Sequence, residues 1–157
     1  MDCSTRRVTP DDAEAIVALL VASITTLCVH DHLNDPETLA RWLRNKTVAD
    51  LQRWLADPED FMFMAELGSV ASGVALLHSS GAIWLCYVLP GLQRRGVGRA
   101  LIQRLEAEAK ARGITELRLT STGSARSFYE SMGFVATGAP RTAFGVLQEY
   151  PYEKKLL

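Results

Sequence analysis

The strongest constraint on the fold of this chain is a turn rich in glycine and arginine that joins an apolar segment to an amphipathic one. The segment 83–90 is aliphatic and aromatic and ends at Pro90, as a buried strand would. The segment 98–112 carries apolar residues at helical spacing and ends before Gly113. Between the two lies the run Gln93-Arg94-Arg95-Gly96-Val97-Gly98-Arg99. The pattern predicts a strand, a tight loop and a helix start.

Such a loop is suited to holding an anion. Glycines such as Gly96 and Gly98 let the backbone come close to a ligand, and Val97 between them opens the helix. The first turn of a helix has unpaired N–H groups and a partial positive charge. Arg94, Arg95 and Arg99 would strengthen this cradle. We therefore expect a phosphorylated ligand here.

Two common phosphate loops do not match this stretch. A nucleotide-binding P-loop needs a Lys followed by Ser or Thr, and neither stands at those places. A dinucleotide fingerprint needs a third Gly or Ala where this chain has Leu101. The pattern therefore indicates neither a nucleotide-binding P-loop nor a dinucleotide-binding loop.

A second motif lies downstream, in the run Ala125-Arg126-Ser127-Phe128-Tyr129-Glu130-Ser131-Met132-Gly133-Phe134. The first loop resembles the pyrophosphate loop of the GNAT superfamily of N-acetyltransferases, and this second run resembles the same family's A-x-x-x-Y-x-x-x-G-F segment. The two motifs occur in the family's order, separated by an expected helix and strand. The resemblance extends over roughly residues 5–137 and is sharpest over residues 86–134.

The resemblance implies an α/β fold and a single domain over residues 1–157. Its sheet would be mixed and mostly antiparallel, flanked by helices, with a central splayed parallel strand pair. The segments 82–89 and 116–120, joined by a helix, are the expected pair because a βαβ crossover makes strands parallel. Segments 61–67 and 70–78 predict a hairpin. Pro151 predicts that the last strand is irregular or at an edge.

The resemblance also implies acetyl-CoA as co-substrate. It places Cys86, Tyr87 and Val88 along the pantetheine and thioester, and residues 94–99 around the pyrophosphate. Arg99 or Arg126 would meet the 3′-phosphate. Many relatives have Asn as a pantetheine contact seven positions before the family's Tyr, where this chain has Thr122. The shorter Thr hydroxyl makes that contact a weak one, and Ser124 is expected to cap the helix that follows.

Acyl transfer from a thioester expels a thiolate, which a positioned Tyr can protonate. The resemblance gives this general-acid role to Tyr129, and the alternative is a ring that packs beside Phe128 and Phe134. Cys86 could form a covalent acetyl-cysteine, although a lone Cys in an apolar strand is more often a small core residue.

The general base is left open by the sequence. Glu66, at the end of segment 61–67, could act through water. Another candidate group is the run of His30, Asp31 and His32. The alternative is that this run is a solvated loop without a catalytic role. Their spacing is poor for zinc, so no metal is expected. Trp42 and Trp54 either pack in the core or line an acceptor pocket.

Composition narrows the partners. A net charge of −1 over 157 residues does not favour a nucleic-acid or acidic-membrane binder, and no apolar run reaches membrane-spanning length. Three widely spaced cysteines and an N-terminus without a signal sequence predict a cytoplasmic protein. The expected activity is acetyl-CoA-dependent N-acetylation of a primary amine of a small molecule or peptide, by direct attack in a ternary complex. The alternative is a non-catalytic module that binds acyl-CoA. A homodimer is a further expectation.

Overall fold

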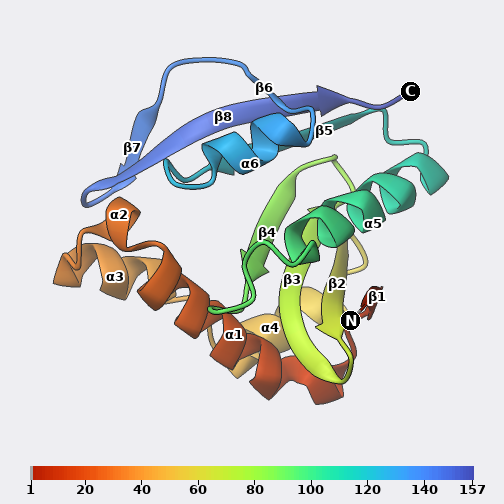
Figure 1. Ribbon diagram of the computed structural model, residues 1–157, viewed down its shortest axis with the longest axis horizontal. Helices are drawn as coiled ribbons and strands as arrows, with labels where there is room; N and C mark the ends of the chain where they lie inside the picture. Colours follow the sequence, from red (N-terminus) through yellow and green to blue (C-terminus); the bar gives the residue numbers. More distant parts are fainter. Residues whose placement is uncertain (1) are drawn as a thin grey trace.

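The computed structural model describes residues 2–157 and contains two sheets flanked by helices (Figure 1). The first sheet has the antiparallel order β1 (Cys3–Arg7), β2 (Asp60–Leu67), β3 (Val70–His78) and β4 (Ile83–Val88). The second is built on β8 (Leu147–Lys155), which pairs antiparallel with β5 (Glu116–Ser121), β6 (Val135–Ala136) and β7 (Arg141–Phe144). The expected mixed, mostly antiparallel α/β class is confirmed.

Helices cover both faces of the first sheet. A 3-10 turn, η1 (Pro10–Asp12), leads into α1 (Ala13–Leu27), and then follow α2 (Val29–His32), α3 (Pro36–Leu43) and α4 (Val48–Ala56). Helices α1 and α4 pack on one face, and α5 (Val97–Ala111) packs on the other. The short α6 (Arg126–Ser131) lies against the second sheet (Figure 1).

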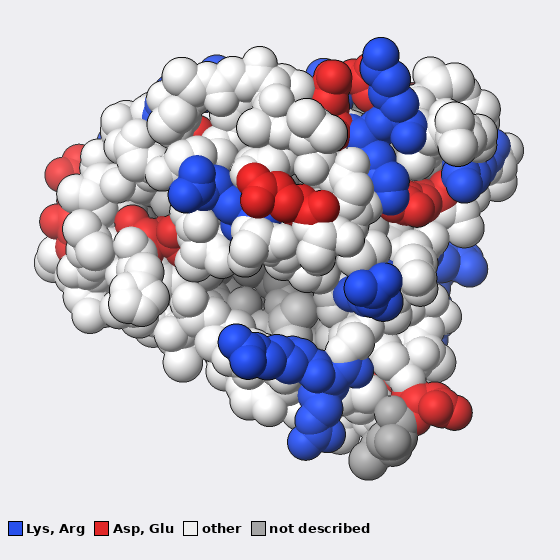
Figure 2. Space-filling view, turned by 45° about the horizontal axis from the view of Figure 1, so that its top comes forward, with Lys and Arg blue, Asp and Glu red and all other residues white. Residues whose placement is uncertain are grey.

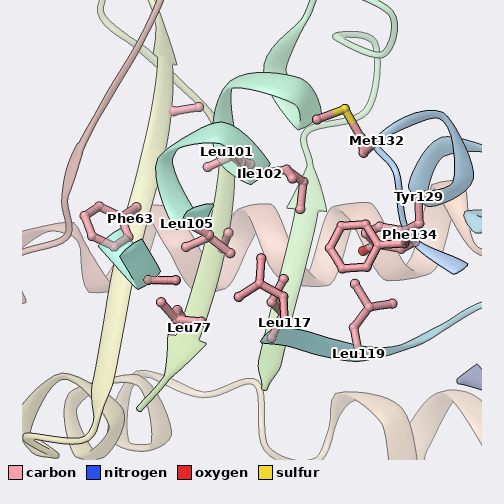
Figure 3. Close-up of a cluster of buried hydrophobic side chains, with 14 of the residues drawn as sticks. Phe63, Leu77, Leu101, Ile102, Leu105, Leu117, Leu119, Tyr129, Met132 and Phe134 are labelled. Atoms are coloured by element: carbon pink, nitrogen blue, oxygen red, sulfur yellow. The ribbon is translucent and has the colours of Figure 1, made fainter. Parts of the chain in front are cut away.

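The two faces of the sheet follow from the alternation of side chains along a strand. In β2, Met62 and Met64 point toward α1 and α4, whereas Phe61 and Phe63 point toward α5. Both sets are apolar, so β2 is buried on both sides and reads as a continuous apolar run. Figure 3 shows how the α5-side cluster continues past the first sheet, through Leu117 and Leu119 of β5 to Tyr129 and Phe134.

The expected parallel pair is not a regular ladder. Among residues 2–157, Ala82 and Arg118 form the one backbone bridge between the β4 and β5 segments, with the Arg118 N–H donating to the Gly81 carbonyl at 2.9 Å. Gly81 has φ +94°, and a side chain there would collide with the carbonyl of Glu116, so glycine permits this one close approach. Past the bridge, β5 takes β8 as its partner and β4 keeps β3.

Pro151 was expected to mark a strand that is irregular or at an edge; β8 is not at an edge, because it has partners on both sides, but its pairing on one side is interrupted at Pro151. The Pro151 carbonyl accepts the Thr137 N–H at 3.0 Å, so the position where Pro lacks an N–H faces the same side. On that side β6 has ended and β7 begins only at Arg141. Pro151 therefore breaks no ladder bond. The strand β7 and its turn at Gly145 were missed by the sequence prediction.

Candidate functional site

One cavity lies between β4, the end of β5, the start of α5 and α6, with the end of α1 on one wall, and is called the α5 cavity. Its volume is about 630 Å³. The sequence-predicted residues that line it are Cys86, Tyr87, Val88, Arg94, Gly96, Val97, Gly98, Arg99, Thr122 and Tyr129. Figure 2 shows a face of the molecule that is hollowed, with Lys and Arg side chains on the rim of the hollow.

The α5 N-terminus presents bare backbone donors. Ala100 is the first residue of α5 whose N–H bonds within the helix, to the Gly96 carbonyl at 3.0 Å. The N–H groups of residues 97–99 precede that bond, no side chain caps them within residues 2–157, and the first turn holds no acid. Gly96 supplies the left-handed turn, with φ +80°. This end of α5 is therefore built to bind an anion.

The two glycines of the loop have different structural roles. Gly96 holds the positive φ, and nothing lies within 4 Å of where its side chain would start. Gly98 has no such φ, but a Cβ there would lie 2.9 Å from Cζ of Phe128 in α6. Gly98 therefore lets α5 and α6 pack closely, and the expected close approach of a phosphate to its backbone stays a prediction.

The predicted arginines divide into two groups. Arg94, whose φ is +63°, and Arg99 both line the α5 cavity. Arg95 is exposed and does not line it. Arg126 stacks on the Tyr150 ring, with its guanidinium carbon 4.2 Å from the ring centre, and also lies off the cavity wall.

The backbone of β4 offers polar groups to the same cavity. The Leu89 N–H donates to the Ser72 carbonyl of β3 at 2.8 Å. N–H groups alternate in direction along a strand. The N–H groups of Val88 and Cys86 therefore point away from β3, opposite to that of Leu89. They face the side on which β4 lacks a strand partner past the Ala82 bridge.

Tyr129 carries a buried hydroxyl group in the lining of the α5 cavity. Its side chain is 7% exposed, and its ring meets Phe134 edge-on at 5.8 Å. Burial, with the neighbouring Cys86 adding to the effect, raises the pKa of the Tyr129 hydroxyl well above its usual value, so it stays protonated. Burial also raises the pKa of Cys86 to about 11, which keeps that side chain a thiol at neutral pH.

The second cavity, called the α3 cavity, has a volume of about 650 Å³ and lies on the face of the sheet that carries α1 and α4. Trp42 of α3 and Trp54 of α4 both line it. The Trp42 indole N–H donates to the Tyr87 hydroxyl at 3.2 Å. The residues that line both cavities are Trp84, Leu85, Tyr87, Thr120 and Thr122. The two cavities therefore meet between β4 and β5.

A family model described as an acetyltransferase (GNAT) domain matches residues 30–156. The chain belongs to the GNAT acetyltransferase family. It is thus an acetyltransferase by family, and the α5 cavity lies where its two family motifs meet. A search of curated proteins found no match.

Solved structures resemble this acetyltransferase over nearly its whole length. A GCN5-related N-acetyltransferase from Rhodopseudomonas palustris is 28% identical, with a TM-score of 0.87 over 99% of this chain and 97% of that one. The PaiA N-acetyltransferase from Thermoplasma acidophilum, in complex with coenzyme A, is 20% identical, with a TM-score of 0.83 over 99% of each chain. The ribosomal-protein-S18-alanine N-acetyltransferase from Escherichia coli is 19% identical, with a TM-score of 0.69 over 99% of this chain and 94% of that one.

The general-base candidates lie apart from the cavities or have structural partners. Glu66 accepts a hydrogen bond from Arg6 Nε at 3.0 Å and lines neither cavity. His32 is fully buried and contacts the Ile24 carbonyl through Nε2 at 3.0 Å, while His30 is exposed. Within residues 2–157 no group of three or more His, Cys, Asp or Glu side chains could hold a metal, and no helix has the length and apolarity needed to cross a membrane.

Asp31 holds the segment before α6 in place. Its carboxylate accepts the Ser124 N–H at 3.1 Å and also bonds the Ser124 hydroxyl. The expectation that Ser124 caps α6 is wrong. The cap position belongs to Ala125, and α6 begins at Arg126. This link ties α2 to the wall that carries Thr122.

Charged residues of the α3 cavity were missed by the sequence prediction. They include Arg44, Lys46 and Asp60, which come from two separate segments. Oδ1 of Asp60 is buried without a hydrogen-bond partner, and burial raises the pKa of this carboxyl. No motif marks these residues, because only the folding of α3 and α4 across the sheet brings them to one wall.

Proposed function

We propose that this acetyltransferase moves an acetyl group from acetyl-CoA to a primary amine of a small molecule or peptide by direct attack in a ternary complex. One observation carries this proposal: the α5 and α3 cavities both reach β4 and share Tyr87 and Thr122. A thioester in one cavity and an amine in the other would meet without either having to leave first.

The α5 cavity fits coenzyme A in its chemistry. The bare N–H groups of residues 97–99, with Arg94 and Arg99 beside them, suit a pyrophosphate. The free backbone edge at Cys86 and Val88 suits the amides of a pantetheine arm. The coenzyme A complex of the similarly folded Thermoplasma protein supports this assignment. Arg95 and Arg126 do not line the cavity, so either side chain would have to move toward a 3′-phosphate to bind it.

Acetyl-CoA supplies the acetyl thioester, and the chain supplies the polar groups around it. The amine nitrogen bonds to the acetyl carbon as the carbon–sulfur bond breaks. The Val88 N–H would polarise the acetyl oxygen. Tyr129 would donate its hydroxyl proton to the sulfur, a role supported by its burial and by its place beside Cys86 on the wall of the α5 cavity. Water in the open α3 cavity takes the proton that the amine loses, since Glu66 lies elsewhere.

Initial-rate kinetics test this order of events. With acetyl-CoA and an accepted amine both varied, a ternary complex gives intersecting double-reciprocal lines. Parallel lines, together with an acetylated Cys86 found by mass spectrometry, would establish the covalent route instead. Tight binding of acetyl-CoA without release of free CoA thiol across a broad amine library would leave only the non-catalytic acyl-CoA-binding module.

Three coarser expectations accompany the proposal. We expect one domain over residues 1–157 and a homodimer, which proteolysis and sedimentation of the free protein check. We expect action in the cytoplasm, where the thiols of Cys3, Cys28 and Cys86 stay reduced. The acceptor named for the Escherichia coli relative is an alanine of a ribosomal protein, which keeps peptide amines among the acceptors to be screened.

A further inference from the structure

The α3 cavity carries a group of cations on one wall. Arg41 lies in the last turn of α3, and Arg44 and Lys46 follow on the connection to α4. The same cavity is lined by two acids, Asp60 and Glu149. Its charged lining therefore has a positive excess, although the whole chain has a net charge of −1.

The existing ion pairs leave two of these cations without a carboxylate. Arg41 pairs with Glu37 at 3.9 Å, and Glu149 pairs with Arg141 at 3.9 Å. Within residues 2–157, neither Arg44 nor Lys46 has an acidic group within 4.0 Å. Asp60 is partly buried in the same cavity, and within residues 2–157 no ion pair joins it to Arg44 or Lys46.

Lys46 is the more constrained of the two. Its ammonium donates to the Trp42 carbonyl at 3.1 Å and to the Asn45 side chain, and an ammonium has three hydrogens. One N–H is therefore left for a ligand. The side chain is partly buried and has no ion-pair partner within 4.0 Å, the Asp50 carboxylate acting on it only from farther away, so an anion that joins it would be stabilising.

Apolar surface lies beside the cations. Trp42, Trp54 and Trp84 line the same cavity, and the hydroxyl of Tyr87 stands on the wall shared with the α5 cavity. A ligand that reaches from the shared wall to Lys46 would pass indole rings and end at positive charge. The cavity volume of about 650 Å³ is that of a small-molecule site.

On this basis, and resting on the proposed acetyl transfer, we propose that the acceptor is a small primary amine that also carries an acidic group, bound by Arg44 and Lys46. The shared chemistry of the acidic group is an oxyanion, either a carboxylate or a phosphate. The amine end would lie toward Tyr87 and the thioester, and the oxyanion would lie toward the end of α3. The chain thus selects its acceptor by the end that does not react.

Matched amines test the inference. The probes are γ-aminobutyrate, its primary amide, aminopropylphosphonate and butylamine, each assayed for release of free CoA thiol. The acidic amines should exceed the neutral ones in kcat/KM by about tenfold or more, the scale of one hydrogen bond between charged groups. The carboxylate and phosphonate arms separate the two kinds of oxyanion. Equal or better use of the neutral amines would overturn the inference.

Variants locate the selectivity. Arg44→Gln and Lys46→Met should each reduce the preference for acidic amines and leave the affinity for CoA unchanged. Arg53→Gln is the matched control, because Arg53 is an exposed cation of α4 that pairs with Asp50 and lines neither cavity. A preference retained in both variants contradicts the assignment. Circular dichroism of each variant checks that the fold is intact.

A binding measurement keeps the test independent of turnover. N-acetyl-γ-aminobutyrate and its amide are titrated into the CoA-loaded protein by calorimetry. Binding of the acid that is about tenfold tighter than binding of the amide supports the inference. Binding of neither, or of both alike, overturns it. Failure of CoA itself to bind would instead overturn the proposed function.

Discussion

The α5 and α3 cavities are similar in volume but are built in different ways. The anion-binding part of the α5 cavity depends on backbone groups of one short stretch, residues 86–99, and residues of α1, β5 and α6 complete its wall. The α3 cavity depends on side chains that come from α3, α4, β2 and the β7–β8 hairpin. Backbone donors tolerate side-chain change, whereas a wall of side chains changes with each substitution. The difference suits a constant cofactor on one side and a variable acceptor on the other.

Removing the Tyr129 hydroxyl should have the largest effect on the rate of acetyl transfer. It should leave ligand binding in both cavities unchanged. In Tyr129→Phe the ring packing against Phe134 stays, so stability should change by no more than about 1 kcal/mol. CoA affinity should be unchanged, while the rate of acetyl transfer should fall by about 10²-fold or more. Single-turnover kinetics measure the chemical step.

Tyr150→Phe is the control for that experiment, because Tyr150 packs under Arg126 and lines neither cavity. A wild-type chemical step in Tyr129→Phe would reduce Tyr129 to a packing residue and leave water as the proton source.

The two loop glycines sharpen the account of the α5 cavity. Gly98→Val pushes on Phe128 and displaces the helix start, so CoA affinity should fall by at least about tenfold. Gly96→Ala places a side chain in open space at φ +80°, which costs about 1–2 kcal/mol of stability, and it should lose less affinity. Calorimetric titration of CoA measures both.

A rescue separates crowding from lost phosphate contact. Phe128→Ala combined with Gly98→Val makes room for the added side chain, so part of the CoA affinity should return. No recovery in a folded double variant would mean that the Gly98 backbone itself must stay uncovered.

Trp54→Ala tests whether the α3 cavity is separate in function. The acceptor KM should rise by about tenfold, equivalent to about 1.4 kcal/mol of lost contact, and CoA affinity should stay near wild type. Trp54→Phe should retain most of the acceptor affinity. Equal losses of CoA and acceptor binding would show that Trp54 serves the core rather than the acceptor.

The smallest expected effect is a pH dependence of acceptor choice. Burial lowers the pKa of Lys46 to about 8, and the charge of Asp50 opposes that shift in part. Below that pH Lys46 is a cation and favours an acidic amine; as the pH rises through about 8 the charge is lost, while Arg44 stays charged. The ratio of kcat/KM for γ-aminobutyrate to that for its amide should fall, by less than about tenfold.

Taking this ratio cancels the titration of the reacting amine, which both substrates share. Lys46→Met supplies the reference, since its ratio should be flat over the same range. A flat wild-type ratio would assign the selectivity to Arg44 alone.

The sequence could predict the glycine and arginine loop of the α5 cavity because the residues of that loop are neighbours in the chain. A turn and a helix start are predicted by Gly96, Val97 and Gly98. Tyr129 lies in a motif whose spacing can be recognised in the sequence. The fold class followed from the same local patterns. The family resemblance then supplied the ligand that a turn by itself does not name.

The α3 cavity could be predicted only in part. Trp42 and Trp54 were expected either to pack in the core or to line an acceptor pocket, and both line the α3 cavity. Lys46 and Asp60 were missed, because their roles depend on which face of the sheet each segment meets. Glu66 was named for its place at a strand end, but its partner Arg6 lies far away in the sequence. Long-range pairing of this kind leaves no periodic signal.

The lone bridge between Ala82 and Arg118 has a consequence for how the molecule opens. The two sheets are joined there by a single backbone contact, so their relative motion is limited mainly by packing between them. A cofactor that bonds β4 on one side and α6 on the other would join the sheets a second time. Amide hydrogens of β5 and β8 should then exchange more slowly when CoA is bound. The slowing should extend beyond the part of β5 that lines the α5 cavity, Leu119 and Thr120, and into β8, which does not line it.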